Sequence, residues 1–270
     1  MMNETNLLII CFYIVLLIIM INLYNFQIFD YIKLIYVIIT IIFSSYGIDY
    51  IFEEKSYWNH ISNILFKNKI IYKNTNCLNN LNNGYLIISN HVNVTDVVLI
   101  RKMIDCYVIG KDSIISKEYS YLKCVDDIFY NNLKIIPYKR NNAKSGNIVK
   151  KKILSKISNN ENVLIFPEGT SQKNCHNGIL PFKKGLFHLA YKYNIKIVPT
   201  VIYYTDKNYG LDKETVFSLN DILNNKNKIY VNFMDPVKPT DFNNVDELID
   251  NIYNKMSRII DKYNIKYLKK

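Results

Sequence analysis

Residues 85–96 have the sequence YLIISNHVNVTD, and this stretch decides the fold class. The apolar run Tyr85–Ser89 predicts a buried strand, and the residues after it predict a helix over Val94–Ile104. Further short strands are expected at Tyr107–Ile109, Asn162–Phe166, Lys196–Tyr203 and Lys228–Met234. Further helices are expected at Ser145–Ser158, Lys183–Tyr193 and Asn244–Tyr263. Strands that alternate with helices predict an α/β domain.

The charge of the chain is strongly basic but unevenly distributed. The 270 residues include 34 basic and 23 acidic residues, which gives a net charge of +11. The first 50 residues hold one lysine against three acidic residues, so the basic excess lies in the remainder. Such an excess suits nucleic acid, an anionic membrane surface or phosphorylated small molecules. Five scattered cysteines without a C-x-x-C pair predict reduced thiols and no metal site.

The N-terminal region predicts a membrane anchor. Leu7–Leu23 is a run of seventeen residues without a charge, long enough for a transmembrane helix. The apolar stretch Leu34–Phe43 is shorter and is expected to be re-entrant, interfacial or a tilted partner of the first helix. A cleaved signal peptide is the alternative, but Glu4 stands where a basic n-region is required. The anchor argues against a nucleic-acid partner.

These features divide the chain into four parts. We expect the anchor at residues 1–50, a connecting segment at 51–80, the main domain at 81–237, and a C-terminal helix with a basic tail at 238–270.

A histidine and an aspartate follow the first strand. His91 and Asp96 are five positions apart, and such positions diverge by about 140° within a regular helix. They meet only when the histidine precedes the helix and the aspartate lies in its first turn. An imidazole is suited to remove the proton of an alcohol that attacks a thioester, and a carboxylate would fix its tautomer. A hydrogen-bonded structural histidine and a helix-start carboxylate are the alternatives for each residue alone.

A second polar cluster, Phe-Pro-Glu-Gly-Thr, occupies residues 166–170. Pro167 fixes φ and Gly169 permits positive φ, so the side chains of Glu168 and Thr170 can turn toward one point at the end of a strand. This edge is where open α/β sheets bind ligands. In isolation, the turn is also compatible with an ordinary loop.

Together the two clusters resemble the glycerolipid acyltransferase family, which includes the 1-acylglycerol-3-phosphate acyltransferases. The sequence blocks of that family fall on Asn90, His91 and Asp96, on residues 166–170, and on Phe182-Lys183-Lys184-Gly185. Residues 135–140 resemble its second block, which ends in arginine, and Val198-Pro199 resembles its fourth block. Lys111 stands where the family usually has a lysine. The resemblance covers roughly residues 80–235.

The resemblance implies a twisted, mixed sheet flanked by helices and an acyltransferase domain at 81–237. It implies that His91 is the general base and that Asp96 is its partner. Substrate contacts are implied for Asn90, Lys111, Arg140, Pro167, Glu168, Gly169, Thr170, Lys183 and Pro199. Arg140 would bind a phosphate, because a guanidinium can hold a phosphate through two parallel hydrogen bonds.

Two positions depart from the family pattern. Ser171 stands where many members have arginine, and Tyr138-Lys139 precedes the arginine of the second block where Asp or Asn is common. A lysophospholipid with a larger head group is therefore an alternative acceptor. Lys139 or Lys173 would compensate for the lost cationic group.

The expected activity is transfer of a fatty-acyl group from acyl-CoA to the sn-2 hydroxyl of lysophosphatidic acid. Acyl-CoA is the co-substrate, no cofactor and no metal are expected, and the lipid bilayer is the remaining partner. The expected location is a membrane, the endoplasmic reticulum or its equivalent in a eukaryotic cell. Asn93-Val94-Thr95 is a glycosylation sequon whose glycan would block the site, which favours a cytosolic active site. A CoA-independent phospholipid transacylase and a catalytically silent lipid-binding protein are the alternatives.

Overall fold

The computed structural model describes residues 70–79, 84–93, 95–111, 134–140, 142–172, 174–205 and 228–268. The predicted membrane anchor at residues 1–50 lies outside the described residues. Within the described ranges, no helix has both the length and the apolar character that crossing a membrane requires.

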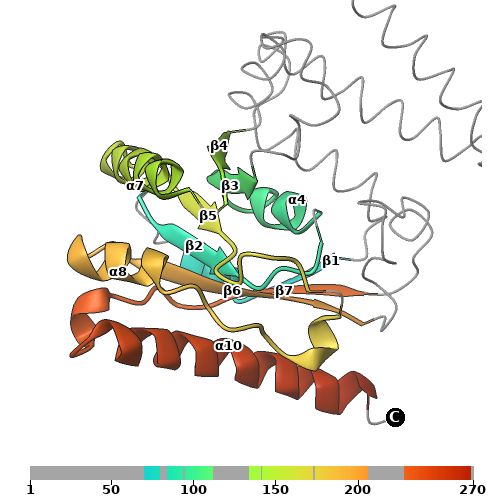
Figure 1. Cartoon of the computed structure of the whole chain (residues 1–270). Coiled ribbons are helices and arrows are strands. Elements are labelled where there is room, and N and C mark those ends of the chain that lie inside the picture. Colours follow the sequence, from blue (N-terminus) through green and yellow to red (C-terminus); the bar gives the residue numbers. More distant parts are fainter. Residues whose placement is uncertain are drawn as a thin grey trace, which may run out of the picture. The chain divides into compact units, whose positions relative to one another are not determined.

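A seven-stranded mixed sheet forms the centre of the described part of the chain (Figure 1). Across the sheet, its strands are β1 (Ile70–Lys73), β7 (Ile229–Phe233), β6 (Ile197–Tyr204), β2 (Leu86–Ser89), β5 (Val163–Ile165), β3 (Tyr107–Lys111) and β4 (Ile135–Tyr138). The strands from β6 to β4 are parallel, β7 is antiparallel to β6, and β1 is parallel to β7. The carboxyl ends of the five parallel strands therefore meet at one edge of the sheet.

Helices cover both faces of the sheet. They are α4 (Asp96–Arg101), α7 (Ala143–Ser158), α8 (Gly185–Lys192) and α10 (Val245–Leu268). Tyr203 of β6 stacks on Tyr263 of α10, whereas the next residue, Tyr204, contacts Asp96 of α4. Because successive side chains of a strand point to opposite faces, α10 and α4 lie on opposite faces of the sheet. α8 packs on α10, and α7 packs on β4 and β5.

The sequence of β6 explains its central position. All eight of its residues are buried, as expected for a strand that is covered on both faces. α10 is amphipathic instead, and it buries Leu248, Ile252, Met256 and Ile260 at helical spacing while its other face is charged.

The α/β class with a mixed sheet flanked by helices is confirmed. Each of the five predicted strands is present, and α10 continues past the predicted end at Tyr263 to Leu268. The sheet begins before residue 81, where the main domain is expected to start. Within the predicted connecting segment 51–80, Ile70–Lys73 forms β1 and pairs with β7. Its four residues are too few to give a clear strand signal, and its partner lies far along the chain.

Candidate active site

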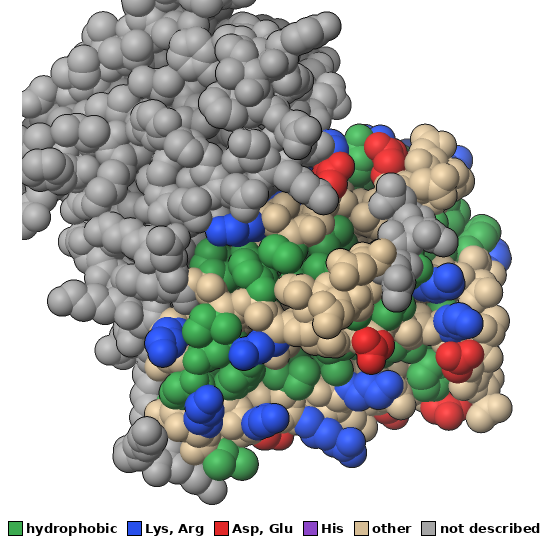
Figure 2. Space-filling view, turned by 180° about the vertical axis from the view of Figure 1, so that it is seen from behind, with side chains coloured by type: hydrophobic (Ala, Val, Ile, Leu, Met, Phe, Trp, Pro, Cys, Tyr) green, Lys and Arg blue, Asp and Glu red, His purple; other side chains and the backbone are tan. Residues whose placement is uncertain are grey.

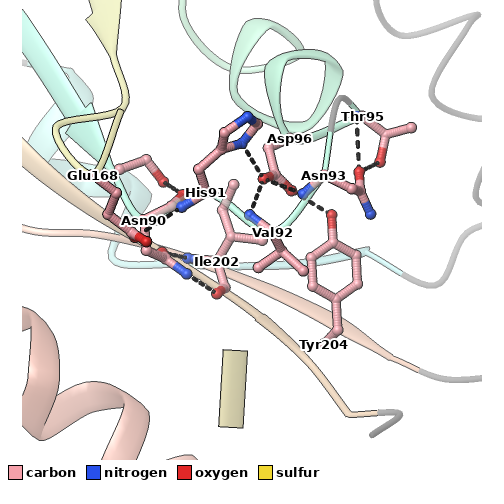
Figure 3. Close-up of polar contacts among 10 residues, drawn as sticks. Asn90, His91, Val92, Asn93, Thr95, Asp96, Glu168, Ile202 and Tyr204 are labelled. Carbon is pink, nitrogen blue, oxygen red and sulfur yellow. Dashed lines mark hydrogen bonds and ion pairs between the residues drawn. The ribbon is translucent and has the colours of Figure 1, made fainter. Parts of the chain in front are cut away.

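His91 and Asp96 are in contact at the carboxyl end of β2 (Figure 3). The Nδ1 atom of His91 lies 3.0 Å from Oδ2 of Asp96, and Asp96 is the first residue of α4. The predicted arrangement, with the histidine before the helix and the aspartate in its first turn, is confirmed. Because Nδ1 faces the carboxylate, Nε2 on the opposite side of the ring is the atom available to take a proton. The His91 side chain retains 21% of its exposure.

The Asp96 carboxylate is completely buried but well supplied with donors. Its Oδ2 atom accepts the backbone N–H groups of Val92 at 2.6 Å and Asn93 at 2.9 Å, in addition to the His91 contact. Its Oδ1 atom accepts the hydroxyl of Tyr204 at 2.5 Å. A buried carboxylate without such donors would be strongly destabilising. These hydrogen bonds offset that cost and hold the carboxylate in one orientation.

Two asparagines shape the chain on either side of His91. Asn90 is 1% exposed, and its amide donates to the Ile202 carbonyl at 2.9 Å and accepts the Ile202 N–H at 2.8 Å. It therefore extends the pairing of β2 with β6, and its contact with a substrate stays a prediction. Oδ1 of Asn93 accepts both the N–H and the hydroxyl of Thr95. Asn93 is only 7% exposed, and its amide oxygen is hydrogen-bonded to Thr95, the third residue of the predicted sequon.

The segment 166–170 forms the predicted tight turn after β5. The Gly169 N–H donates to the Phe166 carbonyl at 3.1 Å, and Gly169 has a φ of +71°, where glycine is favoured. Pro167 is buried and Thr170 is exposed. The Phe166 ring stacks on the imidazole of His91, with the ring centroids 4.1 Å apart and the planes inclined by 21°. This contact restrains the plane of the imidazole.

Glu168 holds the backbone of His91. Its side chain is buried, and Oε1 accepts the His91 N–H at 3.1 Å. Burial raises the pKa of Glu168 from 4.5 to about 7, and the charge of Asp96 acts in the same direction. The N–H groups of His91 and Leu180 partly oppose this increase in pKa. The carboxyl is therefore partly protonated near neutral pH.

Two basic side chains from different elements reach the same turn. Arg140, which follows β4, donates from Nη2 to the Gly169 carbonyl. The aliphatic part of Lys183 lies over Gly169, because a Cβ atom at this glycine would be 3.5 Å from Cε of Lys183. Arg140 and Lys183 are both exposed. The fold thus brings two cationic groups to a turn that is hydrogen-bonded to His91.

Lys111 and Pro199 are the two remaining residues for which substrate contacts are predicted. Lys111 is the last residue of β3 and lies at the same edge of the sheet, but its side chain is outside the described residues. Pro199 is buried within β6 beside Ile88, away from the strand's carboxyl end. The predicted contact of Pro199 with a substrate stays a prediction.

Tyr204 is a site residue that the sequence does not reveal. It stands in an apolar strand where an aromatic residue is ordinary core, and its contact with Asp96 joins positions 108 residues apart. Among the described residues, no group of three or more His, Cys, Asp or Glu side chains could hold a metal ion.

Comparison with known proteins identifies the family. A model of the acyltransferase family matches residues 69–203, which is half of the chain. The chain belongs to the acyltransferase family. The matched residues include His91, Asp96, Arg140 and the turn at 166–170, and they run from the start of the described sheet into β6.

Several curated relatives are similar to this chain over less than half of its length. A 1-acyl-sn-glycerol-3-phosphate acyltransferase from Haemophilus influenzae is 28% identical over 47% of this chain and 51% of its own. The Saccharomyces cerevisiae enzyme of the same name is 31% identical over 44% of this chain and 38% of its own. The alpha form from Homo sapiens is 29% identical over 44% of this chain and 40% of its own. The chain spans about half, or less, of the length of these relatives.

A solved structure shares the fold. The 1-acyl-sn-glycerophosphate acyltransferase PlsC from Thermotoga maritima matches with a TM-score of 0.59 and 16% sequence identity. The match covers 83% of this chain and 87% of the PlsC chain. The resemblance to glycerolipid acyltransferases is thus confirmed at the level of family and fold.

Proposed function

We propose that the chain transfers a fatty-acyl group from acyl-CoA to the sn-2 hydroxyl of lysophosphatidic acid. The observation that carries this proposal is the 3.0 Å contact of His91 with Asp96, beside a turn that binds two basic side chains. The names of the curated relatives support this acceptor, because each is a 1-acyl-sn-glycerol-3-phosphate acyltransferase.

The proposed reaction needs no nucleophile from the protein. The acceptor hydroxyl oxygen attacks the thioester carbonyl while Nε2 of His91 takes the hydroxyl proton. The tetrahedral intermediate then expels CoA as a thiolate, which receives that proton, so the products are the new ester and free CoA. Asp96 stabilises the imidazolium that exists between the two proton transfers. Acyl-CoA is a co-substrate, and no cofactor takes part.

Arg140 and Lys183 would bind the acceptor's phosphate. Both are exposed and both contact Gly169, whose turn is hydrogen-bonded to His91 through Glu168. A guanidinium can bind two phosphate oxygens at once, and an ammonium adds a second positive charge. A phosphate bound there would orient the glycerol hydroxyl toward the imidazole.

A lipid substrate also requires apolar surface. Hydrophobic side chains gather in the middle of the face that Figure 2 shows, with Lys and Arg side chains below them. Such a surface, with basic side chains at its border, suits contact with an anionic bilayer. The apolar N-terminal segment 7–23 would keep the domain at the bilayer, with the active site on the cytosolic side where acyl-CoA is made available.

The test is a panel of donors and acceptors with the full chain in liposomes. Oleoyl-CoA and lysophosphatidic acid should give phosphatidic acid and free CoA, measured by mass spectrometry and thiol release. Faster reaction with lysophosphatidylcholine than with lysophosphatidic acid would assign the larger head group. Acyl transfer between phospholipids without CoA would identify a transacylase, and the lack of any transfer would refute the proposal.

A further inference from the structure

Tyr204 completes the hydrogen bonding of the Asp96 carboxylate. It is the last residue of β6, it is 1% exposed, and its hydroxyl donates to Oδ1 of Asp96 at 2.5 Å (Figure 3). This distance is typical of a hydrogen bond from a hydroxyl to a charged carboxylate. The other oxygen, Oδ2, faces His91 and the N–H groups of Val92 and Asn93.

We propose that Tyr204 is a positioning residue that holds the Asp96 carboxylate at the rotation that directs Oδ2 to His91. The inference rests on the proposed function of His91 as the base. The terminal torsion of an aspartate is broad, so a carboxylate that is bound at one oxygen retains rotational freedom. Hydrogen bonds at both oxygens restrict this torsion, and they keep the imidazole in the tautomer that leaves Nε2 free to accept a proton.

The loop after β5 fixes the position of Tyr204. Sγ of Cys175 accepts the Tyr204 N–H at 3.4 Å, and Nε2 of His176 lies 2.7 Å from the Tyr204 carbonyl oxygen. Burial raises the pKa of the Cys175 thiol to about 12, so the thiol is neutral at physiological pH. These contacts come from η3 (Cys175–Asn177) and hold the strand end beyond the residues that pair with β2.

The same loop also holds the backbone of His91. Glu168 accepts the His91 N–H, and the Gln172 N–H donates to the His91 carbonyl at 2.7 Å. One continuous stretch of chain therefore binds His91 near its start and Tyr204 near its end. Both partners of Asp96 are thus aligned by the loop that also carries the turn at Gly169.

Tyr203 provides a matched control. It precedes Tyr204 in β6, it is fully buried, and its hydroxyl donates to Oδ1 of Asn264 at 3.1 Å on the α10 face. Replacing either tyrosine with phenylalanine keeps a buried ring and removes one hydroxyl. Of these two hydroxyls, only that of Tyr204 contacts the pair formed by His91 and Asp96.

The kinetic test compares Tyr204→Phe with Tyr203→Phe. We expect Tyr204→Phe to lower kcat roughly 10- to 100-fold, by analogy with the hydrogen-bond partners that orient metal-binding histidines. KM for the donor and the acceptor should be unchanged, because the buried hydroxyl does not reach either substrate. Tyr203→Phe should keep kcat, and the melting temperatures of both variants identify any general loss of stability.

A second test does not depend on turnover. NMR of protein with ¹⁵N-labelled histidine, with the His91 signals assigned by their loss in His91→Gln, reports which ring nitrogen of His91 carries the proton. The titratable groups that face the pair are Glu168 after β5, Cys175 of η3 and Tyr204 of β6. Loss of the Tyr204 hydroxyl frees the rotation of the Asp96 carboxylate, so the share of the Nδ1–H tautomer of His91 should fall in Tyr204→Phe and stay constant in Tyr203→Phe.

The results separate the inference from the proposed function. A reduced kcat and a smaller share of the Nδ1–H tautomer of His91, both in Tyr204→Phe alone, would support the inference. Unchanged values in Tyr204→Phe, or equal changes in Tyr203→Phe, would overturn it. If the wild-type chain transfers no acyl group but the tautomer of His91 changes in Tyr204→Phe, the proposed function fails and the positioning of Asp96 by Tyr204 stands.

Discussion

Replacing Glu168 with glutamine removes a carboxyl group that the fold makes difficult to ionise. Burial raises its pKa from 4.5 to about 7 on folding. Below pH 4.5 the carboxyl is protonated in both the folded and the unfolded chain, so ionisation does not affect stability. Between these two pKa values the unfolded chain ionises first, and the wild-type protein loses stability as the pH rises. The loss is complete above about pH 7.

The size of this effect follows from the two pKa values. Their difference of about 2.5 units corresponds to roughly 3 kcal/mol of unfolding free energy, at about 1.4 kcal/mol per unit. Glutamine is neutral and keeps an oxygen that can accept the His91 N–H. We therefore expect Glu168→Gln to be more stable than wild type by up to this amount at pH 8. For a domain of this size, the melting temperature should rise by about 6–12 °C.

The assay is thermal unfolding in one detergent from pH 4.5 to pH 8.5. The difference in melting temperature between Glu168→Gln and wild type should be close to zero at the acidic end and should grow toward pH 7. Glu247→Gln is the control, because Glu247 is exposed at the start of α10 and its loss changes the net charge equally. Parallel curves for Glu168→Gln and wild type would refute the argument that burial suppresses ionisation.

Two further substitutions test other parts of the site. Asp96→Asn should lower kcat by about 10²–10⁴-fold, because an amide favours the wrong imidazole tautomer. Equilibrium binding of the acceptor should persist. A near-normal rate would contradict the role of Asp96 as the partner of His91. Arg140→Ala should mainly raise the apparent KM for lysophosphatidic acid in initial-rate measurements, because the phosphate is held equally in the ground and transition states. Arg140→Lys should not restore the wild-type KM, because lysine lacks the planar fork, and a loss confined to kcat would count against a phosphate contact.

Local sequence was sufficient to predict the relation between His91 and Asp96. Both belong to one short stretch in which a strand ends and a helix begins, so their separation along the chain limits their geometry. The contact between Arg140 and Gly169 joins residues 29 positions apart, and the family resemblance implied only that each of them contacts a substrate. The contact between Tyr204 and Asp96 depends on which face of the sheet the Tyr204 side chain occupies. The apolar sequence of β6 does not indicate which of its residues face α4.

The edges of the sheet were the least predictable part of the fold. β1 has four residues, and β4 contains Pro137, which weighs against a strand. Both strands lie at the edges of the sheet, where a proline can be accommodated because only one neighbour has to be paired. Long-range pairing defines these strands, whereas the central strands are marked by their own apolar runs.

The central claim is that His91 removes the proton of the acceptor hydroxyl, and one comparison tests it most directly. Release of CoA from oleoyl-CoA is measured with and without lysophosphatidic acid, for the wild-type chain and for His91→Ala. The account predicts acceptor-dependent release by the wild type and a rate lower by roughly 10²–10⁴-fold in His91→Ala, with acceptor binding retained. A His91→Ala protein that releases CoA at close to the wild-type rate would contradict the account.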